Sequence, residues 1–220
     1  MRFSNRAEAG RELGRRLAEE PPGGDVVVLG LPRGGVLVAA AVAEALDAPL
    51  DVLTVRKLAA PGRPELAVGA VATGGIRVLE EELLRESGLS PRMLDEVTAR
   101  ELGELDRREH AYRPDRPPLE LTARTAVLVD DGLATGATMR AAVLAARQQG
   151  AAGVVVAVPV STGRAVVLLR ALADRVVVLH VPDPFGAVSA SYADFDQTTD
   201  EEVRAALAQA GPAPGPSATP

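Results

Sequence analysis

The chain has no cysteine, no tryptophan and only two histidines among its 220 residues. Without cysteine it can form no disulfide or zinc–thiolate centre, and it cannot use a cysteine nucleophile. The two histidines, His110 and His180, do not favour a histidine-rich metal site. Aromatic residues make up 2% of the chain, which is too few for a broad surface that stacks nucleic-acid bases.

Basic charge is also scarce. The net charge is −6 and the pI is about 5.1, which disfavours a protein that coats nucleic acid. The longest apolar runs, around 36–46 and 154–160, are too short to span a membrane, and the N-terminus has no signal-peptide pattern. We therefore expect a cytoplasmic protein without membrane or nucleic-acid partners. Hydrophobic residues make up 47% of the chain, enough for a core of Val, Leu, Ala and Ile.

Short apolar runs alternate with helical patterns along most of the chain. Strands are predicted at 25–29, 50–57, 124–130, 153–160 and 175–181, and helices at 5–20, 36–46, 136–149, 163–172 and 200–209. Because each strand is continuously apolar, the pattern predicts a mainly parallel, doubly wound α/β sheet with helices on both faces.

Residues 58–113, in the middle of the chain, do not follow this alternation of strands and helices. A Pro- and Gly-rich loop is predicted at 58–65, and a hairpin at 66–80 with its turn at Gly74-Gly75. A long charged helix follows from Ser90 to about Arg113, with Pro91 at its first position.

We expect a single domain over 1–210. Hood or lid elements would be inserted at about 58–120 and 182–210. The hood would combine the N-terminal helix, the hairpin, the long helix and the C-terminal segment. Residues 211–220, rich in Pro and Gly, are predicted to be a disordered tail.

The most informative stretch is "VLVDDGLATGATM", residues 127–139. Asp130 and Asp131 end an apolar strand, and a turn of small residues leads into a helix. Backbone N–H groups and the helix N-terminus favour an anion there, and Thr135 and Thr138 add hydroxyl donors. The turn is not a Walker A loop, since it contains no Lys. The plainer interpretation is that Thr135 only caps the helix and the glycine only permits the turn.

Two carboxylates would repel a phosphate unless something separates them. A sugar phosphate resolves the conflict, because its hydroxyls can donate to the acids while its phosphate occupies the turn. Magnesium can lie between carboxylates and further phosphate oxygens. The stretch therefore predicts a ribose phosphate bound with Mg²⁺.

This stretch resembles the phosphoribosyl-pyrophosphate signature of type I phosphoribosyltransferases, particularly the adenine form with Ala-Thr-Gly-x-Thr. The resemblance extends over most of residues 25–181 and is closest to bacterial phosphoribosyltransferases whose substrate is not established. It implies that Asp130 and Asp131 hold the ribose hydroxyls and the metal. It also implies that the donor binds along Gly132, Leu133, Ala134, Thr135, Gly136, Ala137 and Thr138, with the 5′-phosphate on the last five.

Two further turns should lie at the same sheet edge. The turn "GLPRGGV" (30–36) resembles the family's pyrophosphate loop, in which Gly34 and Gly35 let the backbone approach the anion and Arg33 pairs with it. Taken alone, it is equally typical of an ordinary strand-to-helix turn.

The second turn follows Arg56 and Lys57. Lys57 is the single lysine in a chain with 24 basic residues, and a compact ammonium suits a phosphate oxygen. The pair resembles the Arg-Lys that opens the mobile loop of orotate phosphoribosyltransferases. This resemblance implies that Arg56 and Lys57 approach the pyrophosphate and stabilise it as it leaves, although a lone surface lysine can also persist by chance. Residues 58–65 would then belong to a lid that excludes water.

The acceptor side is less defined. Residues 181–195 resemble the base-contacting segment of hypoxanthine-guanine phosphoribosyltransferases, where Phe185 would stack on a base. Core packing is an equal alternative for Phe185. Those enzymes carry an acid where this chain has Ala134, which puts purine salvage through that acid in doubt.

The resemblance thus implies a phosphoribosyltransferase. It would move ribose 5-phosphate from Mg-bound phosphoribosyl pyrophosphate to a small nitrogen acceptor. The expected partners are the donor, an acceptor base and a second copy of the chain in a homodimer. Two alternatives stay open: a non-catalytic sensor of phosphoribosyl pyrophosphate, and a hydrolytic or phosphorolytic enzyme on the same fold.

Overall fold

The structure, a computed structural model, describes residues 2–60, 63–114, 116–117 and 119–210. The predicted tail, 211–220, lies outside them. The centre is a five-stranded sheet in the order β2 (Leu50–Val52), β1 (Val26–Gly30), β6 (Thr125–Val129), β7 (Gly153–Val160) and β8 (Arg175–His180). Every neighbouring pair of these strands is parallel. The prediction of a doubly wound, mainly parallel α/β sheet is confirmed.

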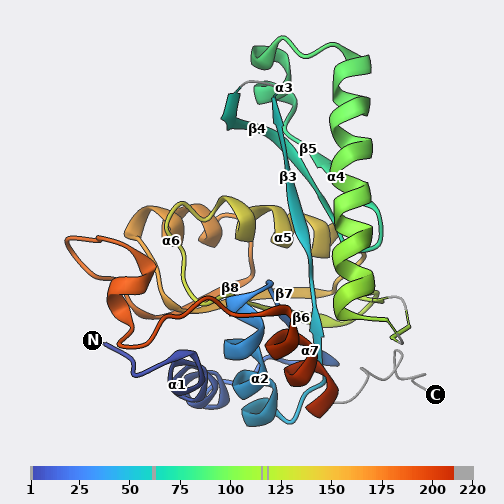
Figure 1. The fold of residues 1–220 in the computed structure, drawn as a ribbon. Helices are drawn as coiled ribbons and strands as arrows, with labels where there is room; N and C mark the ends of the chain where they lie inside the picture. The colour runs from blue at the N-terminus through green and yellow to red at the C-terminus, as the bar shows by residue number, and fades with distance from the viewer. Residues whose placement is uncertain (1, 61–62, 115, 118, 211–220) are drawn as a thin grey trace.

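Helices cover both faces of this sheet (Figure 1). One face packs against α1 (Arg6–Ala18), α2 (Gly34–Leu46) and α7 (Asp200–Gln209), and the other against α5 (Ala137–Gln148) and α6 (Gly163–Arg170).

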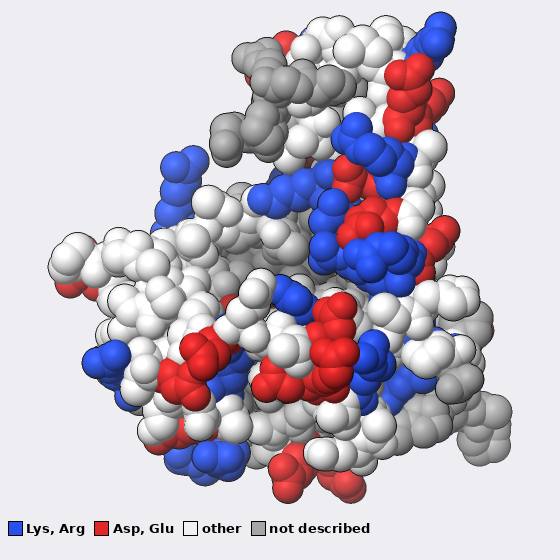
Figure 2. Space-filling view, viewed as in Figure 1, with Lys and Arg blue, Asp and Glu red and all other residues white. Residues whose placement is uncertain are grey.

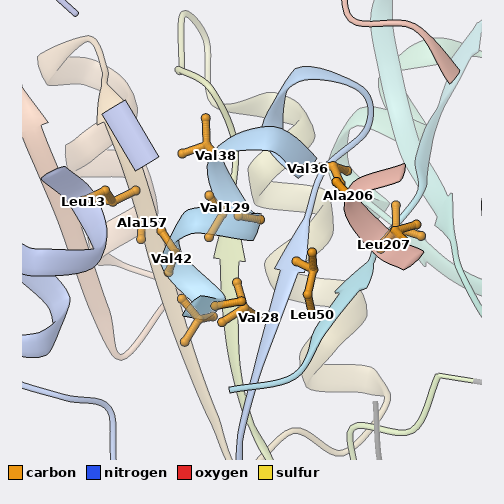
Figure 3. Packing of buried hydrophobic residues seen from close by; sticks show 14 of the residues in the cluster. Leu13, Val28, Val36, Val38, Val42, Leu50, Val129, Ala157, Ala206 and Leu207 are labelled. Atoms are coloured by element: carbon orange, nitrogen blue, oxygen red, sulfur yellow. The ribbon is translucent and has the colours of Figure 1, made fainter. Parts of the chain in front are cut away.

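The side chains of strand β6 alternate between two hydrophobic cores, one on each face of the sheet. Val127 and Val129 enter the α2 side, which Figure 3 shows, while Ala126 and Leu128 enter the α5 side. All four are fully buried. Because successive side chains point to opposite faces, a strand covered on both must be apolar throughout.

An arm projects from this body (Figure 1). It consists of an antiparallel sheet of β3 (Val55–Ala60), β4 (Arg63–Ala72) and β5 (Ile76–Leu79), the helix α3 (Glu81–Ser87) and the long helix α4 (Pro91–Tyr112). The predicted turn at Gly74-Gly75 and the predicted cap at Ser90 are confirmed: both glycines have positive φ, and Ser90 Oγ accepts from the Met93 N–H.

Two local predictions were wrong here. Residues 58–65 are not a loop, because most of them continue β3 and β4, with Ala60 paired to Arg63. Leu58 and Ala60 are buried, so tertiary packing overrides the Pro and Gly signals; residues 61–62 lie outside the described residues. The single strand predicted at 50–57 is two strands, β2 in the body and β3 in the arm.

Helix α1, which the sequence groups with the hood, lies in the body beside α2. Gly10 permits this approach, since a Cβ there would lie 2.6 Å from the Val38 carbonyl oxygen. Helix α3 was not predicted; it has no buried residue, so no apolar stripe marks it.

The base of α4 is tied to the body through Asp51. This carboxylate is 2% exposed and receives two hydrogen bonds from Arg113, at 2.9 and 3.0 Å, with Arg116 at 3.6 Å. A buried carboxylate held by two guanidinium groups fixes where the arm leaves the body. Among the described residues, no helix is long and apolar enough to cross a membrane.

Candidate donor site

The order in which strands are added to the sheet reverses between the parallel neighbours β1 and β6. The chain leaves β1 toward β2 on one side and leaves β6 toward β7 on the other. In open parallel sheets, ligands bind beyond the carboxyl ends of strands at such a switch point. The turns after β1 and β6 therefore face one crevice. Figure 2 shows a hollow between the arm and the body, with basic and acidic residues intermixed along the arm and a group of Asp and Glu on the body below.

Asp130 and Asp131 directly follow β6 at the carboxyl edge of the sheet. The backbone N–H of Asp131 donates to Asp130 Oδ1 at 2.9 Å. Burial raises the pKa of Asp130 well above its usual range, and the neighbouring Asp131 charge raises it further. Burial also raises the pKa of Asp131, against the opposing effect of Arg6, which pairs with it. Two desolvated carboxylates at a ligand edge are typical of a functional site.

The turn after β1 touches the acid pair. A Cβ at Gly35 would lie 2.8 Å from Asp130 Cα and from the Val129 carbonyl oxygen, and a Cβ at Gly34 would collide with the Asp131 carboxylate. Only glycine fits this approach. Arg33, before the two glycines, is partly exposed, and its Nη1 lies 3.8 Å from Asp200 Oδ1. Arg33 lines a pocket of about 220 Å³ together with Tyr112 and Asp200.

The turn after β6 leads directly into the N-terminus of α5. Gly136 is the N-cap of α5 with φ 75°, and the Thr135 hydroxyl accepts from the Ala137 N–H at 3.3 Å. Thr162 fixes the turn from the side by donating to the Ala134 carbonyl at 2.8 Å. The exposed side of Ala134 and Thr135 and the first turn of α5 can thus receive an anion.

The structure separates Arg56 from Lys57. Two nitrogens of the Arg56 guanidinium, Nε and Nη2, donate to Glu101 Oε2 of α4 at 3.0 and 2.8 Å. Lys57 points to the opposite side of β3 and lines a cleft of about 520 Å³ with Thr135, Ala137 and residues of the arm sheet. Adjacent strand residues face opposite ways, so the two do not converge on one anion.

Aromatic side chains gather on the other flank of the acid pair. The chain has three Phe and two Tyr, and four of these five rings form one cluster: Phe3, Phe185, Tyr192 and Phe195. Phe185 is partly buried there, which matches its packing alternative; base stacking stays a prediction. The Tyr192 hydroxyl donates to the Asp131 carbonyl at 2.6 Å, and burial raises its pKa.

Sequence reasoning missed Arg6 and Tyr192. Each contacts Asp131 across a large sequence separation, 125 and 61 positions respectively. Arg6 lies in no motif, and Tyr192 lies within 181–195 without any feature of that segment that marks it.

The acid pair suits magnesium in its chemistry. Within the described part of the chain, no group of three or more His, Cys, Asp or Glu could hold a metal. Mg²⁺ is commonly bound through one or two carboxylates, with substrate phosphates and water completing its shell. Asp130 and Asp131 would be the protein ligands.

The fold places the chain among the doubly wound α/β proteins, with an acid pair and two strand-to-helix turns at its switch point. Comparison with known proteins then gives the family. The family model for the phosphoribosyl transferase domain matches residues 4–194, and the chain belongs to this family.

Its relatives support the same assignment. Proteins from two strains of Mycobacterium tuberculosis, each named "Putative phosphoribosyl transferase", are 50% identical over 208 residues, covering 94% of this chain and 47% of theirs. The chain thus spans about half the length of these relatives. The crystal structure of a Thermus thermophilus protein, TT1426, is 48% identical, with a TM-score of 0.87, over 95% of this chain and 99% of that one.

Proposed function

We propose that the protein transfers ribose 5-phosphate from phosphoribosyl pyrophosphate to a nitrogen acceptor and releases pyrophosphate. The observation that supports this most directly is the contact between the two turns. Gly34 and Gly35 touch Asp130 and Asp131 so closely that no side chain fits between them. An anion on the first turn and a sugar on the acids would therefore be neighbours, as in one donor molecule.

The residues divide the donor among them. Asp130 and Asp131 would accept hydrogen bonds from the ribose hydroxyls, and the turn 134–138 would hold the 5′-phosphate through backbone N–H groups and the two threonine hydroxyls. Arg33 and the backbone at Gly34 and Gly35 would take the pyrophosphate.

The chemistry is a substitution at C1 of the ribose. A bond forms from the acceptor nitrogen to C1, the C1–oxygen bond breaks, and its electron pair leaves on pyrophosphate; the acceptor then loses a proton. Bound Mg²⁺ would neutralise charge on the pyrophosphate. The chain itself supplies positioning and stabilisation of the leaving group, and no side chain acts as a nucleophile.

The two basic residues of β3 enter this scheme differently. Lys57 shares a cleft with Thr135, so we assign it to the 5′-phosphate side of the donor. Arg56 is held by Glu101 on the other side of β3. We assign Arg56 to the structure of the arm rather than to the pyrophosphate.

The acceptor side is formed by the segment with Phe185 and by Ala134, where purine enzymes carry an acid. We propose a nucleobase-like nitrogen acceptor that does not depend on an acid at that position. Following the family, we further propose a cytoplasmic homodimer, which light scattering at several concentrations tests.

Calorimetric titration of Mg²⁺ and phosphoribosyl pyrophosphate tests the donor site; heat is the suitable signal because the chain lacks tryptophan. The wild type should bind the donor only with Mg²⁺, and the Asp130→Asn/Asp131→Asn variant should lose at least about 100-fold in affinity, since two charged contacts are removed. Asp106→Asn, an exposed change on α4, is the control. A folded wild type that binds no donor would refute the assignment.

A second assay separates the enzyme from its alternatives. Pyrophosphate release is followed while a panel of nucleobases and amines is offered with the donor. A nucleoside monophosphate or its analogue as product supports the transferase. Binding without any product favours the sensor, and ribose 5-phosphate formed without an acceptor favours a hydrolase.

A further inference from the structure

Arg6 reaches the acid pair from the first turn of α1. Its Nε donates to Asp131 Oδ2 at 2.8 Å, and the two side chains are only 12% and 16% exposed. The same guanidinium borders the turn after β1, since a Cβ at Gly34 would lie 2.7 Å from Arg6 Nε. Arg6 thus lies where the acid pair and the first anion turn meet.

Several contacts hold the Arg6 guanidinium in position. Its Nη1 donates to the Asp196 carbonyl at 2.8 Å, and its guanidinium lies 3.9 Å from the centre of the Phe195 ring. The Phe195 ring packs 4.9 Å from that of Tyr192. Tyr192 returns to the acid pair through its hydroxyl bond to the Asp131 carbonyl. A guanidinium stacked on a ring and bonded on two edges has little freedom.

The segment before Arg6 pairs with the same part of the chain. The Phe3 N–H donates to the Ser191 carbonyl, and the Ala193 N–H donates to the Phe3 carbonyl, both at 2.8 Å. The N-terminal residues therefore fasten residues 191–196 beside the acids. Arg6 is the charged end of this attachment.

We propose that Arg6 is a positioning residue of the donor site, which pairs with Asp131 Oδ2 and offsets one negative charge of the acid pair. This rests on the proposed function. Two free carboxylates would attract a divalent cation in the absence of donor and would repel the donor's phosphates. Arg6 offsets the negative charge of Asp131, and the site then favours the cation together with the donor over the cation alone.

The proposal predicts opposite effects of one substitution. In Arg6→Gln, affinity for a divalent cation alone should rise about tenfold, because a second carboxylate becomes available at the same site. Affinity for the donor with Mg²⁺ should fall at least about tenfold, because the pair regains its full negative charge. A merely structural role would weaken both.

Manganese(II) is the probe for the first effect, since its free aqua ion is counted by electron paramagnetic resonance; calorimetry measures the second. Arg2→Gln is the matched control, because Arg2 bonds the Tyr192 carbonyl at 3.1 Å in the same segment without touching an acid. It should leave both affinities unchanged. Arg6→Lys keeps the charge and should restore wild-type manganese affinity.

Circular dichroism and thermal unfolding establish that each variant is folded. If folded Arg6→Gln binds manganese no more tightly than the wild type, the proposal is overturned. A wild type that binds no donor would instead refute the proposed function, and the manganese comparison, made without donor, still decides whether Arg6 occupies Asp131.

Discussion

The body and the arm are built on opposite principles. The body sheet is parallel and covered on both faces, so β6 and β7 are buried along nearly their whole length. The arm sheet is antiparallel, with a small apolar cluster against α4 around Leu58, Val71 and Leu105. Outside this cluster, α4 carries ion pairs such as Arg92–Glu96 and Arg107–Glu104.

This difference predicts that the body is the more rigid region and the arm the more adaptable one. The body holds the acid pair and the turns after β1 and β6 directly after strands that are almost completely buried. The arm brings Lys57 over the cleft from a smaller core, and exposed ion pairs contribute little to stability. We therefore expect the arm to open before the body, as a separate unit of lower local stability.

The largest effect should come from the joint between the two regions. Asp51→Ala removes the carboxylate that Arg113 and Arg116 share and leaves buried guanidinium charge without its partner. The free energy of unfolding should fall by about 4 kcal/mol, measured by urea denaturation. Asp95→Ala is the comparison, because the Asp95 side chain is 74% exposed in its pair with Arg77; it should cost less than about 1 kcal/mol, as surface pairs do. If the two variants lost equal free energy of unfolding, Asp51 would not be the residue that joins the arm to the body.

Two leucine truncations should separate the cores. Leu128 in the body and Leu58 in the arm are both fully buried, and each change to Ala should cost about 3 kcal/mol. Native-state hydrogen exchange should show faster exchange throughout the protein for Leu128→Ala. For Leu58→Ala it should show faster exchange confined to β3–β5 and α4. Uniform acceleration in both variants would mean that arm and body unfold as one unit.

The smallest effect concerns two glycines. Gly103 lies within α4, and no described atom lies within 4 Å of a Cβ placed there. Gly103→Ala should stabilise the protein by about 1 kcal/mol, because alanine is the better helix former. The same change at Gly35 should destabilise it, since the new Cβ would press on the backbone of β6. Thermal unfolding of both variants checks the sign, and a stabilised Gly35→Ala would contradict the close approach of the turn to the acids.

Much of the body could be predicted from the sequence because its signals are local. A strand covered on both faces must be apolar throughout, so 124–130 and 153–160 are recognisable without any partner. The acid pair, the glycines and the threonines of 127–139 act within one strand–turn–helix unit. The position of these residues relative to one another could therefore be predicted from consecutive residues.

The arm could be predicted only in part. The hairpin turn and the cap of α4 are local and were confirmed, but the Pro- and Gly-rich stretch at 58–65 was expected to be a loop. The burial of Leu58 against α4 and the burial of Ala60 are long-range effects that no local pattern reports. The division of 50–57 between two sheets likewise depends on which strands happen to be neighbours.

By itself, the sequence determined the parallel sheet, the order of its elements and the turns at its carboxyl edge, because periodicity and turn chemistry depend on adjacent residues. Only the tertiary structure decided that Arg6 pairs with Asp131, that four of the five rings gather beside it, and that Arg56 and Lys57 face apart. These outcomes join residues far apart in the chain, and packing selects such pairs from many that the sequence permits equally.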